Sequence, residues 1–286
     1  MELVEAALLG IVQGLTEFLP VSSSAHLILV PWFFGWRPEG LTFDVSLHLG
    51  TAVAVLVYFW REWVVLAGAT IRGLAEKKPF SDASRRLAWY LLLGILPAMV
   101  VGLAFEREVE EFLRSPLISV VTLVVFAVYL YCADRWGSQN RTLDQLSLAD
   151  SISIGISQAL ALVPGVSRSG VTIGTGMLRN LDRFSAAKFS FLLATPVIVG
   201  AALLQGWRLF QAVYNPSAFS GGPGIAGPVV VQWDVLAVGV CSASLTGFFC
   251  IRYFLRFLQT KSLLPFVVYR LILAGVLLTF YLTNRV

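Results

Sequence analysis

The residues of this chain that could do chemistry gather in one apolar stretch, residues 10–30. Gln13 and Glu17 are four residues apart, so they share one face of a helix. Pro20 then interrupts the helix, and Ser22, Ser23 and Ser24 restart it with His26 one turn further on. The spacing puts His26 on the same helical face as Ser22 and Ser23, which is the arrangement of a nucleophile and its base. The stretch therefore predicts a broken helix with a reactive group at the break.

Glu17 and Gln13 are also candidate metal ligands. An ionisable residue within an apolar span is costly to bury, so Glu17 is a functional candidate by default. Its carboxylate and the Gln13 amide offer oxygen atoms to a hard cation such as Mg²⁺ or Ca²⁺, which often binds through one or two carboxylates and the phosphate oxygens of a substrate. Because an amide is uncharged, we expect a divalent-cation site that is weak until the substrate completes it.

A second break lies 145 residues later, because residues 155–171 align with residues 10–26 without a gap. A helix that restarts after a break presents free N–H groups and the positive end of its dipole, both of which attract anions. Capping alone explains any single serine here, but two facing helix starts together with Arg168 would cradle a phosphate or diphosphate. The serines best placed for this are Ser22 or Ser23 at the first break and Ser167 or Ser169 at the second.

The composition is that of an integral membrane protein. The chain is 57% hydrophobic and 13% charged with a mean hydropathy of +0.78, whereas soluble domains average about 25% charged residues. We expect six crossings, at residues 43–60, 87–105, 117–133, 189–206, 229–251 and 263–282. The two broken segments are expected to be re-entrant hairpins, because non-helical backbone is tolerated at membrane depth only within protein or beside a water-filled cavity.

The offset of 145 predicts two halves, residues 1–134 and 150–284, within a single membrane domain covering residues 1–286. Residues 92–113 also match residues 237–258, with Gly94/Gly239 among the identical pairs. Each half holds one hairpin and three crossings, and an odd number of crossings predicts that the second half is inverted. Fourteen of the 21 Lys and Arg residues then lie on the cytoplasmic side and five outside, as the positive-inside rule favours. We therefore relate the net charge of +4 to topology and expect no nucleic-acid partner.

Several other residues are expected to have structural roles. His48, near Asp44 in the first crossing, is expected to make a structural hydrogen bond, and Arg270 to be a buried or snorkelling cation. The three cysteines lie within apolar spans without metal-binding or redox spacing, which predicts small core residues. The Gly- and Pro-rich segment 215–228 is expected to be an outer loop.

At the two breaks the sequence resembles the undecaprenyl-diphosphate phosphatase family, the bacitracin-resistance type of integral membrane phosphatase. The first family motif is matched by Gln13, Glu17 and the run Phe18-Leu19-Pro20-Val21-Ser22-Ser23 with His26. The second, Pro-Gly-x-Ser-Arg-Ser-Gly followed by Thr, is matched by residues 164–170 and Thr172. The resemblance continues through residues 189–196 and 265–270 and so covers essentially the whole chain.

The resemblance implies hydrolysis of undecaprenyl diphosphate, a C55 polyprenyl lipid, to the monophosphate and inorganic phosphate. This reaction recycles the carrier lipid for peptidoglycan synthesis and gives bacitracin resistance, at the periplasmic face of the bacterial inner membrane and with a divalent cation. Carried over by position, Ser23 is the candidate nucleophile and His26 its base or orienter, with His26 as nucleophile the open alternative. Glu17 and Gln13 take the metal and water site, with Gln13 standing where some relatives have Glu. Arg168 acts on the diphosphate, with Ser22, Ser24, Ser167, Ser169, Gly170 and Thr172 as further substrate-binding residues.

Two other classes of protein compete with the phosphatase. Inverted repeats with broken helices are common in carriers, so an alternative is a transporter or flippase for the polyprenyl phosphate lipid. The halves differ, however, where chemistry is expected: Glu17 corresponds to Leu162, and His26 to Val171. A catalytic site requires that asymmetry and a carrier does not. A purely structural membrane protein leaves the buried ionisable residues unexplained. A homodimer is compatible with the sequence.

Overall fold

The computed structural model describes residues 2–36, 41–112, 115–214 and 232–283, and these residues form helices and connecting turns without a β-strand. The predicted outer loop at residues 215–228 lies outside this part of the chain. The helices that surround the site are α1 (Leu3–Phe18), α2 (Ser23–Phe34), α3 (Leu41–Tyr58), α7 (Leu148–Ala159), α8 (Arg168–Leu178) and α9 (Arg183–Tyr214). The others are α4 (Trp60–Ala75), α5 (Ala83–Phe112), α6 (Pro116–Trp136), α10 (Trp233–Leu258) and α11 (Leu264–Leu282), with short 3₁₀ turns at Leu143–Gln145 and Leu160–Leu162.

Five of the six predicted membrane crossings coincide with long apolar helices of the structure. Among the described residues, five helices are long and apolar enough to span a bilayer: Ala83–Phe105, Leu117–Trp136, Arg183–Leu204, Trp233–Leu258 and Leu264–Leu282. The sixth prediction, residues 43–60, coincides with α3, which continues after Phe59 into α4 through a bend of 72°. The sequence pattern did not predict this bend. The bend has a physical reason, because α4 is amphipathic and α3 is not. The polar residues of α4 include Arg61, Glu62 and Arg72. Its buried residues Leu66, Ala69 and Gly73 form one stripe.

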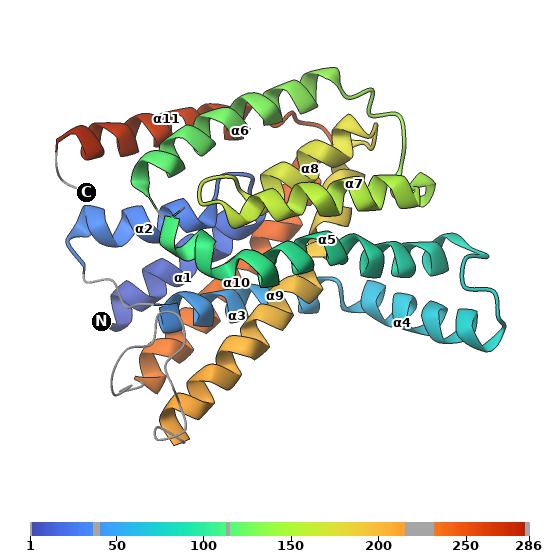
Figure 1. Cartoon of the computed structure of the whole chain (residues 1–286), viewed down its shortest axis with the longest axis horizontal. Coiled ribbons are helices and arrows are strands. Elements are labelled where there is room, and N and C mark those ends of the chain that lie inside the picture. The colour runs from blue at the N-terminus through green and yellow to red at the C-terminus, as the bar shows by residue number, and fades with distance from the viewer. Residues whose placement is uncertain (1, 37–40, 113–114, 215–231, 284–286) are drawn as a thin grey trace.

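The two predicted breaks are present, and both have the same unusual backbone. α1 ends at Phe18 just before Pro20, and α2 begins at Ser23 with Ser22 as its N-cap at φ 75°. At the second break, the 3₁₀ turn that follows α7 ends before Pro164, and α8 begins at Arg168 with Ser167 as its N-cap at φ 71°. Positive φ is uncommon for residues other than glycine and concentrates at functional sites. Figure 1 shows the α1–α2 hairpin entering from the end that holds the N-terminus and the α7–α8 hairpin entering from the opposite end.

Close helix packing recurs at the offset of 145 residues. A Cβ added to Gly10 of α1 would lie 2.5 Å from the carbonyl oxygen of Gly239 in α10, and one on Gly155 of α7 would lie 2.0 Å from that of Gly94 in α5. Gly10 corresponds to Gly155 and Gly94 to Gly239, so each hairpin packs against a helix of the other half in the same way. This reciprocal packing supports the two-part plan, while the division at residues 134 and 150 and its inversion across a membrane remain predictions.

Candidate functional site

The two helix breaks meet near the centre of the molecule. The Ser169 hydroxyl donates to the carbonyl oxygen of Leu19 at 2.9 Å, which joins the start of α8 to the break after α1. Arg270 of α11 is fully buried and donates to the carbonyl oxygens of Pro20 at 3.4 Å and Gly165 at 2.8 Å, so one guanidinium connects both breaks. Arg270 has the structural role predicted for it, with the addition that it places a positive charge behind both helix starts.

Glu17 is the centre of a polar cluster between the breaks. Ser23 donates its hydroxyl hydrogen to Glu17 Oε2 at 2.6 Å, and Gln13 donates its amide N–H to the same oxygen at 3.0 Å. The other carboxylate oxygen, Oε1, is paired with Nη2 of Arg168. Because a carboxylate only accepts hydrogen bonds, it holds the Ser23 oxygen with its hydrogen pointing at the base. We call Glu17, Ser23 and Arg168 the reactive cluster.

A cavity of about 270 Å³ opens beside the reactive cluster. Its polar wall holds all three cluster residues, and its apolar wall is formed by α5, α9 and the turn after α7. The lining residues are Glu17, Ser22, Ser23, Ser24, His48, Ala98, Gln158, Ala161, Leu162, Ser167, Arg168, Val197, Ile198 and Ala201. Gln158 is 3% exposed, and its amide oxygen and nitrogen have no hydrogen-bond partner among the described residues. A buried amide without partners is costly, which makes Gln158 a candidate to bind a polar ligand in the cavity that it lines.

The predicted substrate-binding residues divide into two groups. Ser22, Ser24 and Ser167 line the cavity, whereas Ser169, Gly170 and Thr172 are buried and are not part of its lining. In that second group, Gly170 donates its N–H to the Ser167 hydroxyl at 3.2 Å, which is the predicted N-cap interaction. Thr172 is fully buried and shares a hydrogen bond of 2.6 Å with Ser190 of α9, which fixes α8 against that helix.

His26 lies next to Ser22 and not next to the Ser23 hydroxyl. Its Nδ1 is 2.7 Å from the carbonyl oxygen of Ser22, and its Nε2 is 2.6 Å from the Tyr269 hydroxyl. A carbonyl oxygen can only accept, so Nδ1 carries the hydrogen, and Nε2 of the neutral ring accepts from Tyr269. His26 thus holds the backbone of the strained residue Ser22. The sequence spacing correctly predicted contact with the Ser22 position but could not show that the backbone would be the partner.

His48 joins the site, although the sequence reading expected only a structural role. Its Nε2 is 3.8 Å from Glu17 Oε2, and it lines the cavity. The corresponding position in the second half is Leu193, so His48 breaks the repeat in the same way as Glu17 and His26 do, but it lies outside both helix breaks. The available signal was its ionisable ring within an apolar crossing, the same reason that marked Glu17.

The described residues offer few oxygen ligands for a divalent cation at this site. Among the described residues, no group of three or more His, Cys, Asp or Glu side chains is placed to hold a metal. Gln13, however, contacts Glu17 through its amide nitrogen, and its Oε1 is buried without a hydrogen-bond partner among the described residues. An orphaned amide oxygen on a residue that contacts a carboxylate is compatible with a cation that takes most of its remaining ligands from a substrate phosphate and water.

Comparison with known proteins identifies the family. The sequence profile described as "Bacitracin resistance protein BacA" matches residues 6–276, nearly the whole chain. The chain belongs to the BacA family. Among its BacA relatives, a protein of Desulforudis audaxviator is 45% identical over 269 residues, covering 94% of each chain. One of Moorella thermoacetica is 42% identical over 100% of both chains, and one of Pelotomaculum thermopropionicum is 43% identical over 95% of this chain and 94% of its own. All three are named undecaprenyl-diphosphatase.

Proposed function

We propose that this BacA-family protein is a membrane phosphatase that hydrolyses undecaprenyl diphosphate to undecaprenyl phosphate and inorganic phosphate. The observation that carries the proposal is the reactive cluster in its cavity, where a serine hydroxyl donates to a carboxylate that is itself paired with an arginine. Phosphoryl transfer depends mainly on positioning and on stabilising negative charge, and this cluster supplies a nucleophile, a base and a cation. The names of the relatives supply the substrate.

In the first step, Ser23 Oγ attacks the terminal phosphorus while Glu17 Oε2 accepts the hydroxyl proton. The bond from that phosphorus to the bridging oxygen breaks, and the lipid monophosphate leaves with the electron pair. Glu17 then passes its proton to the departing phosphate oxygen, which leaves phosphoserine at position 23. The 2.6 Å hydrogen bond between Ser23 and Glu17 is the geometry that a base needs for this transfer.

In the second step, water attacks phosphoserine. Glu17 accepts a proton from that water and returns it to Ser23 Oγ as the phosphorus–serine bond breaks, which releases inorganic phosphate and restores the enzyme. Arg168 stabilises the phosphoryl oxygens in both steps with its fork of N–H donors. It is the first residue of α8, so its guanidinium and the free N–H groups of the helix start act on the same anion.

His26 is a positioning residue in this mechanism, because both ring nitrogens are hydrogen-bonded to protein groups and the residue is not part of the cavity lining. By holding the Ser22 carbonyl it fixes the turn from which Ser23 projects. His48 places its imidazole Nε2 3.8 Å from Glu17 Oε2, so it helps to hold the base in position. Gln158 offers its free amide to the phosphate oxygens or to the attacking water.

Gln13 and Glu17 would hold a Mg²⁺ or Ca²⁺ ion together with the substrate phosphates, as their orphaned and charged oxygens suggest. When bound, such a cation supplies positive charge that reduces the repulsion between the diphosphate and the Glu17 carboxylate.

The excess of Lys and Arg on one side favours a cytoplasmic location for that side. The charge bias concerns the topology alone. From the resemblance to the family we place the protein in the bacterial inner membrane with the cavity accessible from the periplasm, where it would recycle the carrier lipid for cell-wall synthesis and so contribute to bacitracin resistance.

The test is phosphate release from C55 polyprenyl diphosphate by the purified protein in detergent, with the lipid product identified by mass spectrometry. We expect equal amounts of phosphate and lipid monophosphate, loss of activity with a chelator, and recovery with Mg²⁺ or Ca²⁺. Activity that survives exhaustive chelation would remove the cation from the proposal. No hydrolysis by folded protein that binds the lipid would refute the phosphatase and favour a carrier, which a lipid-flipping assay in liposomes would then examine.

A further inference from the structure

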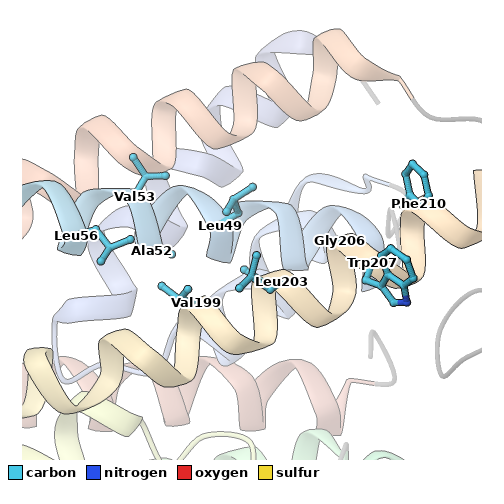
Figure 2. A pocket seen from close by; sticks show the side chains of 10 residues that line it. Leu49, Ala52, Val53, Leu56, Val199, Leu203, Gly206, Trp207 and Phe210 are labelled. Carbon is cyan, nitrogen blue, oxygen red and sulfur yellow. The ribbon is translucent and has the colours of Figure 1, made fainter.

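An apolar groove runs along the outer side of the α3–α9 pair. Figure 2 shows the two helices side by side, with Trp207 and Phe210 of α9 at one end of the groove. The groove has a volume of about 510 Å³, nearly twice that of the polar cavity. Its lining is Leu49, Ala52, Val53 and Leu56 from α3, and Val199, Ala202, Leu203, Gly206, Trp207 and Phe210 from α9. All of these residues are apolar, so the groove suits a hydrocarbon ligand.

The groove and the polar cavity share their walls. On α3, His48 lines the cavity and the next residue, Leu49, lines the groove. On α9, Ile198 and Ala201 line the cavity, while their neighbours Val199 and Ala202 line the groove. The two helices therefore present adjacent faces to a charged site and to an apolar one.

The partition between them is a small apolar cluster. Ala52, Ala194 and Ile198 pack together there as a separate apolar cluster, with Val199 against it. A ligand with a charged head in the cavity has only this partition between its head and the apolar groove. The order of polar cavity, apolar partition and apolar groove matches an amphipathic molecule whose diphosphate is joined directly to a long apolar chain.

We infer that the α3–α9 groove is the binding site for the isoprenoid chain of the substrate. The inference rests on the proposed function and extends it, because it assigns recognition of the chain to residues outside the reactive cluster. An ordinary acyl chain of a bilayer lipid can touch the same surface, but only the substrate has its chain tethered to a head group in the adjoining cavity. Tethering raises the effective concentration of the chain at the groove.

Gly206 is the best position for testing this site. A Cβ added at Gly206 would meet no atom of the described residues within 4 Å, so a large side chain can enter the groove without displacing them. Gly200 of the same helix is a matched control, because its surroundings are equally open and it does not line the groove. Six residues of helix separate the two, which places them on different faces.

The experiment compares Gly206→Trp and Gly200→Trp with the unmodified protein on C55 and C15 polyprenyl diphosphates. We expect Gly206→Trp to raise KM for the C55 lipid roughly tenfold, the effect of losing a few matched groups in an apolar pocket, while kcat stays unchanged. Its KM for the C15 lipid should rise less, and Gly200→Trp should behave like the unmodified protein. Equal kinetics for the two variants on the C55 lipid would overturn the inference.

A second pair of variants tests the opposite wall. Val53→Trp fills the groove from α3, and Val57→Trp, one turn further along and outside the lining, is its control. Only Val53→Trp should reproduce the KM effect. If either groove variant instead changes the oligomeric state in size-exclusion chromatography without changing KM, the groove is a contact between copies of the chain and the inference fails. Failure of the proposed function is distinct, because the unmodified protein would then release no phosphate from either lipid.

Discussion

Replacement of Glu17 by glutamine removes the base of the reactive cluster while keeping its shape. In the unmodified protein the Ser23 hydroxyl lies 2.6 Å from the carboxylate. The amide oxygen of the variant can still accept that hydrogen bond, but it cannot take the proton. Loss of a general base typically lowers a rate by 10²–10⁴-fold. We therefore expect kcat to fall about 10³-fold, equivalent to about 4 kcal/mol in the barrier. Arg168 loses its anionic partner in this variant, so in the absence of a divalent cation the diphosphate should bind as tightly as before or several-fold more tightly.

The assay measures phosphate release over a range of C55 diphosphate concentrations, together with binding of the lipid in the absence of turnover. Glu62→Gln is the matched control, because Glu62 of α4 forms a partly exposed ion pair with Lys188 at 3.1 Å, away from the cavity. That control should keep nearly all activity. The reasoning is refuted if Glu17→Gln keeps more than about a tenth of kcat, because a base worth at least 10²-fold cannot then be at this position.

Three further substitutions test other parts of the account. Arg168→Lys keeps the charge but loses the forked donors, so kcat/KM should fall about 10–100-fold, and unchanged kinetics would remove Arg168 from the phosphate site. His26→Asn retains an N–H close to the place of Nδ1 and should keep more activity than His26→Ala if His26 positions Ser22, whereas equal loss in both would favour His26 as the nucleophile. Gly155→Ala puts a methyl group 2.0 Å from the Gly94 carbonyl oxygen, so the free energy of unfolding should drop by about 1–3 kcal/mol. Thermal unfolding in detergent, with Gly200→Ala in open space as the control, measures this, and equal melting of the two would contradict the close packing.

Local patterns predicted the parts of the site that lie on one segment. The four-residue spacing of Gln13 and Glu17 predicted a shared helical face, and the two side chains are hydrogen-bonded. Pro20 and Pro164 marked the breaks, because proline cannot continue a helix. The offset of 145 also predicted that Arg168 would face the first break, and it pairs with Glu17 there.

Contacts between distant segments were harder to predict. His48 and Tyr269 reach the site from α3 and α11, and neither follows the repeat or lies beside a break. The partner of His26 depended on which groups of the turn point inward, and helical spacing alone does not determine that. The bend at Phe59 was missed because the apolar run through residues 43–60 continues across it, and only the amphipathic pattern of α4 marks the change of direction.

The most direct test of the reactive cluster is the position of the phosphoryl group during turnover. Purified protein is mixed with C55 diphosphate that carries ³²P in its terminal phosphate, quenched within milliseconds in acid or in alkali, digested and mapped by mass spectrometry. The account predicts an acid-stable label on the peptide containing Ser23, which builds up more in conditions that slow water attack and is lost in Ser23→Ala together with activity. A label that is lost in acid, survives alkali and maps to His26, or full turnover by Ser23→Ala, would contradict it.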